Sequence, residues 1–175
     1  MKILGTGSSL PQKIVSNDDL AQVMDTSDEW ISSRTGIKMR HIAVEETTTS
    51  MSVDAAKKAL CDASVDAEDI DLIIAATVSP DYIFPTLACE VQAALGAAHA
   101  TAFDIGAGCS GFLFALATAD AYFASGRFQK ALIIGAETLS KMMDWSDRST
   151  CVLFGDGAGA AVLRAEGGQL LSMVQ

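Results

Sequence analysis

The strongest constraint on the fold is an alternation of short apolar runs with longer helix-like segments between residues 71 and 135. The apolar runs have the length and composition of buried strands, and they are residues 71–78, 101–105 and 130–135. Helix-like segments at 85–95 and 109–125 separate them, and each segment stops at a glycine, Gly96 or Gly126. Such a series is typical of a mainly parallel sheet with helices on its faces. The sequence therefore predicts an α/β fold.

The segments before this series predict further elements. Ile3 and Leu4 run into a glycine turn, Asn17 can cap a short helix through Met24, and residues 40–44 suit a short strand. Further helix signals are a Thr26-x-x-Glu29 capping box, helical spacing of apolar residues over 50–63, and Pro85 in the first turn of the helix that ends at Gly96.

The end of the chain has a different pattern, in which strand-like segments follow one another without predicted helices between them. After Trp145, apolar segments at 151–154, 159–163 and 170–174 follow one another and predict strands, with a hairpin among them. We expect one domain, residues 1–175, built on a mixed, mainly parallel five-stranded sheet covered by helices.

The composition supports a folded chain and argues against a nucleic-acid partner. Half of the 175 residues are hydrophobic and 19% are charged, so enough apolar surface is available to offset the entropy of ordering. The formal net charge is −10, and a field of that sign repels phosphate backbones. An anionic ligand would therefore need a few local Arg or Lys residues.

The sequence shows no signal for a membrane segment. No apolar run approaches the ~20 residues that a membrane helix needs, and Gly5, Gly7 and Pro11 follow too early for a signal-peptide core. We expect a cytoplasmic protein without a membrane partner.

The four cysteines are Cys61, Cys89, Cys109 and Cys151, and none forms a CxxC pair. Their wide spacing predicts neither a zinc site nor a disulfide framework. Cys61, Cys89 and Cys151 lie in apolar helix or strand patterns and are interpreted as packing residues.

Cys109 differs because it lies where a predicted strand passes through small residues into a predicted helix. A helix N-terminus offers free N–H groups and a positive dipole end, and both favour a thiolate. The neighbouring glycines allow an acyl group to approach, and the Cys109 N–H can face an oxyanion. The position predicts a nucleophile, with a small buried turn residue as the alternative.

A nucleotide-binding interpretation competes at the same segment. Gly106, Gly108 and Gly111 match the G-x-G-x-x-G fingerprint between a strand and a helix. The fingerprint normally lies in the first strand–helix turn and has an acidic residue about 20 residues further on. Neither condition is met, since the next acid after the following strand is Glu137. A nicotinamide oxidoreductase is therefore the weaker alternative.

Several motifs occur in a fixed order along nearly the whole chain: Asp25–Ile31, Arg34–Ile37 with Arg40, Phe84–Pro85, Cys109–Phe112 and Phe154–Ala160. Together they resemble β-ketoacyl-acyl-carrier-protein synthase III, of the thiolase-like superfamily. The resemblance implies the amino-terminal thiolase-like half of that fold. Gly106 and Gly108 stand where the family often carries other small residues. Residues 154–160 are interpreted as a structural turn in which Asp156 accepts hydrogen bonds.

The resemblance implies a condensing enzyme that initiates fatty-acid synthesis. Cys109 would take an acyl group from acyl-coenzyme A and condense it with malonyl-acyl carrier protein, with loss of carbon dioxide. Splitting the condensation into two steps is the advantage of a covalent intermediate. Coenzyme A enters as part of the substrate, and no metal, flavin or nicotinamide cofactor is implied.

The resemblance also assigns binding residues. Trp30 and Arg148 would stack on the two sides of the coenzyme A adenine, and Arg34 and Thr35 would hydrogen-bond the nucleotide nearby. Phe84 would close the acyl pocket of the neighbouring subunit in a homodimer. Without the resemblance, Trp30 is interpreted as a helix-face core residue and Arg148 as a solvated charge.

The family's active site also needs a histidine and an asparagine, and neither is identified here. His41 lies in a predicted strand segment that matches a structural stretch of the family, and His99 lies in the turn from Gly96 to Ala100, so both are interpreted as surface or structural residues. We expect a complementary carboxyl-terminal half to carry the pair, and this chain alone to be nearly inactive. Two alternatives are another cysteine acyltransferase of the superfamily, such as hydroxymethylglutaryl-coenzyme A synthase or a secondary-metabolite ketosynthase, and a non-catalytic half-fold that serves as an interaction module.

Overall fold

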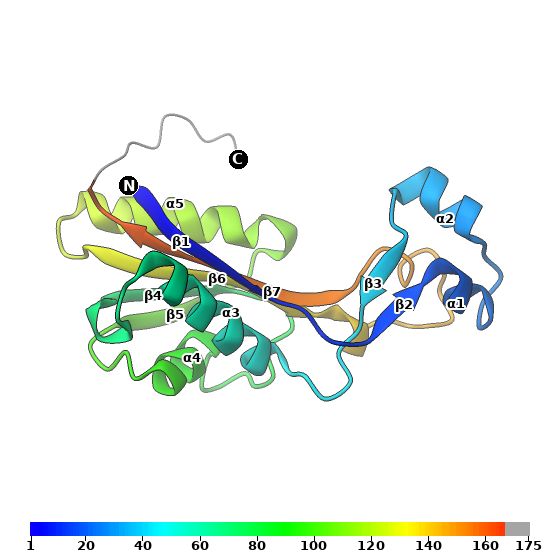
Figure 1. The fold of residues 1–175 in the computed structure, drawn as a ribbon, viewed down its shortest axis with the longest axis horizontal. Helices are drawn as coiled ribbons and strands as arrows, with labels where there is room; N and C mark the ends of the chain where they lie inside the picture. The colour runs from blue at the N-terminus through cyan, green and yellow to red at the C-terminus, as the bar shows by residue number, and fades with distance from the viewer. Residues whose placement is uncertain (167–175) are drawn as a thin grey trace.

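A computed structural model describes residues 1–166, which form a five-stranded sheet with helices on both faces and a smaller part beside it (Figure 1). The strands follow the order β1 (Lys2–Ser9), β7 (Asp156–Arg164), β6 (Lys130–Thr138), β4 (Leu72–Ala76) and β5 (Thr101–Ile105). β4 is parallel to β5 and β6, whereas β7 is antiparallel to β6 and β1. The predicted α/β fold with a mixed five-stranded sheet is confirmed, with its parallel pairs around β4.

Helices cover the two faces unequally. α3 (Thr48–Ala63) and α4 (Leu87–Leu95) lie on one face, and α5 (Gly111–Ala124) lies on the other (Figure 1). Alternate residues of β4 point to the two cores: Ile73 packs in the α3 and α4 core, and Ile74 packs in the α5 core. Each such fully buried side chain contributes about 1.5–3 kcal/mol. Burial on both faces explains the continuous apolar run that predicted this strand.

The first strand corrects the prediction of a glycine turn after Leu4. Gly5 and Gly7 lie inside β1, where the backbone of α3 approaches the strand directly. A Cβ on Gly7 would lie within 3.0 Å of Ala55 O and Ala59 N. Glycine is therefore required by close packing of the helix on the strand, and not by a turn.

The smaller part contains β2 (Ile14–Ser16), α1 (Asn17–Ala21), α2 (Asp28–Thr35) and β3 (Met39–His41), and Figure 1 shows it beyond one end of the sheet. β2 and β3 pair antiparallel. Both predicted caps were wrong by one residue. Ser16 caps α1 and Ser27 caps α2, because their hydroxyls accept the N–H groups of Asp19 and Trp30.

The segment between β6 and β7 is the largest departure from the predictions. Residues 151–154 form turns, not a strand, because Cys151 and Val152 are buried against Leu20 and Ile31 of the smaller part. The predicted strand at 159–163 is confirmed within β7, but it pairs with β6 and β1. The predicted strand at 170–174 lies outside the described residues.

Short 3-10 turns complete the structure, at Ala67–Asp69, Gly108–Ser110 and Leu139–Lys141. Asp156, at the start of β7, accepts hydrogen bonds from Ala43 N at 2.7 Å and from Ser140 N at 2.9 Å. The prediction that Asp156 accepts hydrogen bonds is confirmed, but the predicted turn at 154–160 is wrong, because the chain is already in β7 from Asp156 onward.

Candidate active site

Cys109 lies in the 3-10 turn between β5 and α5, and it is an exposed residue. The helix predicted to begin at Cys109 begins instead at Gly111, so the cysteine precedes the helix. Gly108 has a φ of +52°, a left-handed conformation that side chains rarely adopt. The glycine before the cysteine is thus required by the turn.

Close packing at the start of α5 fixes this turn on the sheet. A Cβ on Gly111 would lie 2.9 Å from Ala76 Cβ, and Phe112 packs over Gly135 of β6. The Thr77 N–H donates to Ile105 O at 3.2 Å. The carboxyl ends of β4, β5 and β6 therefore meet beneath Cys109, which is the edge where parallel sheets place ligands.

Glu137, near the carboxyl end of β6, holds the segment that follows β4. Its carboxylate accepts from Val78 N at 3.0 Å and from the Ser79 hydroxyl. The Ser79 hydroxyl in turn accepts from Thr138 N at 2.8 Å. From the sequence Glu137 was weighed only as a ribose-binding acid, because nothing in the local pattern indicates a bond to a loop residue 59 positions away.

The segment after β4 carries Phe84 on its surface. The side chains of Tyr82, Ile83 and Phe84 are exposed, with Phe84 at 85%. The helix that follows begins at Leu87, so Pro85 lies before the helix and not in its first turn. Asp104 of β5 caps this helix instead, because its carboxylate accepts from Leu87 N and Ala88 N, each at 2.8 Å.

A second cluster forms around Trp30 in the smaller part. The guanidinium of Arg34 lies 4.4 Å from the Trp30 ring centroid, and that of Arg148 lies 5.1 Å from it. Both distances are in the range of cation–π attraction. Arg148 also donates to the backbone carbonyl and the carboxylate of Asp25. The structure thus brings together three of the predicted binding residues, and Asp25 is a partner that sequence analysis did not identify.

Thr35 lies in the same helix as Trp30, and its hydroxyl is used locally. The hydroxyl donates to Ile31 O at 2.8 Å and accepts from Ile37 N at 3.0 Å. A cavity of about 260 Å³ adjoins the cluster, lined by Ser27, Glu29, Trp30, Ser33 and Arg34. The Trp30 and Arg34 side chains therefore border open space, whereas the Thr35 hydroxyl is held against its own helix.

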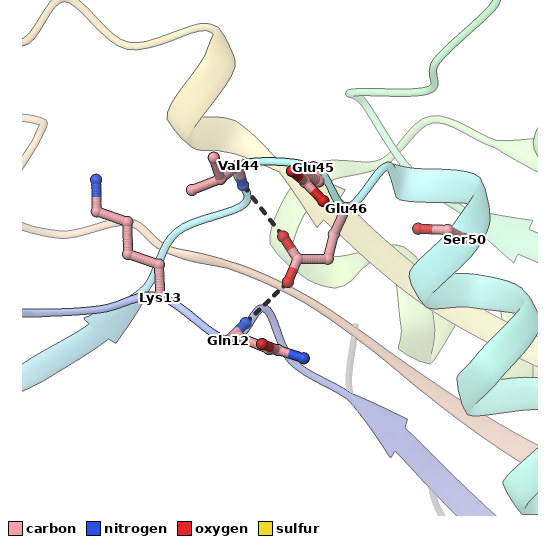
Figure 2. Close-up of a pocket in the computed structure, with 6 residues that line it drawn as sticks. All are labelled: Gln12, Lys13, Val44, Glu45, Glu46 and Ser50. Atoms are coloured by element: carbon pink, nitrogen blue, oxygen red, sulfur yellow. Dashed lines mark hydrogen bonds between the residues drawn. The ribbon is translucent and has the colours of Figure 1, made fainter.

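A larger cleft of about 570 Å³ lies between the smaller part and the main sheet. Figure 2 shows the Glu46 carboxylate between the backbone N–H groups of Gln12 and Val44, at 2.9 and 3.1 Å. The N–H of Gln12, followed by the backbone N–H groups of Glu46 itself and of Val44, lowers the pKa of Glu46 to about 2. The lining residues were not predicted as a site, and the Glu46 carboxylate connects the segment before β2 to the segment after β3.

Of the three cysteines interpreted as packing residues, Cys151 is buried and Cys89 is partly buried, whereas the prediction is wrong for Cys61, which is exposed. Burial raises the pKa of the Cys151 thiol. Cys61 lies on α3, and His41 Nδ1 lies 2.6 Å from Pro11 O. Within residues 1–166, no three potential metal-ligating side chains lie together, and no helix has the length and apolar character needed to cross a membrane.

Comparisons with known proteins agree with this geometry. A family model for 3-oxoacyl-[acyl-carrier-protein (ACP)] synthase III matches residues 103–175. The β-ketoacyl-[acyl-carrier-protein] synthase III of Streptococcus pneumoniae strain Hungary19A-6 is 56% identical over 164 residues, which are 94% of this chain and 51% of that protein.

Solved structures give the same result. The 3-oxoacyl-[acyl-carrier-protein] synthase III of Aquifex aeolicus VF5 superposes with a TM-score of 0.92 at 56% identity, over 93% of this chain and 53% of that chain. The synthase III of Thermus thermophilus gives a TM-score of 0.89 at 46% identity, over 94% of this chain and 51% of that chain. These comparisons do not favour the two alternatives, another cysteine acyltransferase of the superfamily or a non-catalytic interaction module. The chain spans about half the length of these relatives, and over that half it is similar in sequence and fold to β-ketoacyl-[acyl-carrier-protein] synthase III proteins.

Proposed function

We propose that this chain forms the acyl-accepting half of a condensing enzyme that initiates fatty-acid synthesis. The Cys109 thiolate attacks the carbonyl carbon of an acyl-coenzyme A, and the bond from that carbon to the coenzyme A sulfur breaks. Coenzyme A leaves with the proton that Cys109 gave up. The acyl group remains on Cys109 as a thioester, so one difficult condensation becomes two easier steps.

In the second step, malonyl-acyl carrier protein loses carbon dioxide. The electron pair left on its carbon forms a bond to the acyl carbonyl, and the Cys109 thiolate leaves. The product is a β-ketoacyl-acyl carrier protein. The relatives' printed name, which includes an acyl carrier protein, supports this partner.

The Trp30 cluster is proposed to bind the coenzyme A nucleotide. An aromatic face and guanidinium planes can both stack on a base, and guanidinium groups pair with phosphate. Trp30, Arg34 and Arg148 lie together and border a cavity, which supports the assignment. Thr35 is proposed to contribute through its hydroxyl oxygen, since the hydroxyl proton is donated to Ile31 O.

Two parts of the proposal require protein beyond the described residues, namely a complementary half and a second subunit. A complementary half would supply the histidine and asparagine that stabilise the negative charge formed in the second step, and losing one such stabiliser typically costs about 10²–10³-fold in rate. Phe84 would meet the acyl pocket of the second subunit in a homodimer, and its exposed ring is compatible with that role. The cytoplasmic location remains a prediction.

The observation that carries the proposal is an exposed cysteine on a tight turn at the carboxyl edge of a parallel sheet. The test is intact-mass measurement after incubation with acetyl-, isobutyryl- and longer acyl-coenzyme A. We expect one acyl adduct, located on Cys109 and absent from Cys109→Ser. Cys61→Ser is the matched control, because Cys61 is also exposed. Equal labelling of Cys109→Ser and the unmodified protein would contradict the proposal.

A further inference from the structure

Arg40 of β3 is a charged side chain to which the proposed reaction assigns no role. It is 5% exposed, and its guanidinium is hydrogen-bonded to Asn17 and to Val152 O. Its stem packs at Gly155, where a Cβ would lie 3.2 Å from Arg40 Cβ. A buried charge is costly unless it makes hydrogen bonds, so the partners of this guanidinium show what its burial achieves.

The guanidinium connects β3 to two other segments of the chain, residues 15–17 and the turns at Val152. It donates to Val15 O of β2 at 3.2 Å, to Asn17 Oδ1 at 2.7 Å and to Val152 O at 3.3 Å. Val152 lies four residues after Arg148, in the turns that carry that side chain. One end of the network therefore holds the Arg148 segment.

The other end of the network reaches α2. The Asn17 amide nitrogen donates to Asp28 Oδ1 at 2.8 Å, to Ser32 Oγ at 3.3 Å and to Ile37 O at 2.7 Å. Asp28 and Ser32 lie on α2, which carries Trp30. Arg40 and Asn17 thus form a hydrogen-bonded path from the segment of Arg148 to the helix of Trp30.

We propose that Arg40 is a positioning residue that sets the separation of Arg148 and Trp30, and thereby the affinity for the nucleotide of coenzyme A. This inference rests on the proposed function of the Trp30 cluster. Stacking on both sides of a base requires a defined gap, and small misplacements of a binding group cost large factors in rate or affinity. Three acceptors, two of them in residues 15–17 and one at Val152, suit the planar fork of arginine and not the single ammonium of lysine.

The experiment compares two thioesters in the complete protein. Acetyl-coenzyme A contains the nucleotide, whereas acetyl-pantetheine has the same reacting group without it. For Arg40→Met we expect kcat/KM of Cys109 acylation by acetyl-coenzyme A to fall about 10-fold to 100-fold, mainly through KM. The value for acetyl-pantetheine is expected to change by less than about twofold. Arg127→Met is the control, since Arg127 is exposed near the far end of α5.

Arg40→Lys tests the same inference if Arg40→Met does not fold, because lysine keeps the charge and much of the stem. We expect it to show the same selective loss for acetyl-coenzyme A. An equal loss with both thioesters, or no loss with either, would overturn the positioning role. Failure of the proposed nucleotide-binding role gives a different result. In that case the unmodified protein would be acylated equally well by both thioesters, before any variant is compared.

Discussion

Replacing Gly111 by alanine would press the helix of the proposed nucleophile against the strand beneath it. The new Cβ would lie 2.9 Å from the Cβ of Ala76, which is 5% exposed and has little room to move. Overpacking of this kind typically costs about 1–3 kcal/mol, and alanine returns up to about 1 kcal/mol of helix propensity. We expect a net loss of about 1–2 kcal/mol in the free energy of unfolding.

Urea unfolding measures this loss without reference to activity. The informative comparison is a double-mutant cycle with Ala76→Gly, which removes the Cβ that the new methyl group meets. We expect Gly111→Ala to be better tolerated in the Ala76→Gly background, with a coupling energy of about 1–3 kcal/mol, the size of the overpacking cost. The rate of Cys109 acylation should follow the same pattern, because the turn moves with the start of α5.

Additive effects of the two substitutions would refute this reasoning. The contact between α5 and β4 would then not determine where Cys109 lies. A Gly111→Ala variant as stable as the unmodified protein would lead to the same conclusion.

Three further outcomes are expected. Gly7→Ala should destabilise strongly, by at least about 2 kcal/mol in urea unfolding, because the Cβ would overlap the backbone at Ala55 O. Gly108→Ala should lose about 1–2 kcal/mol, and Gly108→Asn less, because only the left-handed φ of +52° is strained. The hydrogen bond from Lys38 Nζ, followed by that from the Asn17 amide, lowers the pKa of Asp28 from 3.8 to about 2. The stability gained from Asp28 is therefore complete above pH 3.8 and lost as pH falls through about 2, so the Tm difference from Asp28→Asn should shrink over that range.

The central sheet could be predicted because its strands are buried on both faces. A run such as Leu72–Ala76 is apolar throughout, and glycines end the neighbouring helices. β1 was missed because its Gly5 and Gly7 look like a turn, whereas the need for glycine comes from a helix about 50 residues later. Residues 151–154 were misassigned because their apolar side chains pack against the smaller part and not in the sheet.

The exposure of Cys109 follows from a local pattern, a strand that passes through glycines into a helix, and so it could be anticipated. The Trp30 cluster could not be derived from local pattern, because Arg148 reaches it from more than 100 residues away. The capping role of Asp104 and the bonds of Glu137 also join distant segments. Contacts of this kind depend on which strands become neighbours, which is a property of the whole fold.

Two guanidinium groups lie beside the Trp30 ring. Arg34 and Arg148 both lie within 5.1 Å of its centroid, so their positive charges are separated by no more than about one Debye length at 0.1 M salt, roughly 10 Å. Their mutual repulsion favours an anion beside them. If the Trp30 cluster binds the coenzyme A nucleotide as proposed, its affinity should therefore decline as ionic strength rises.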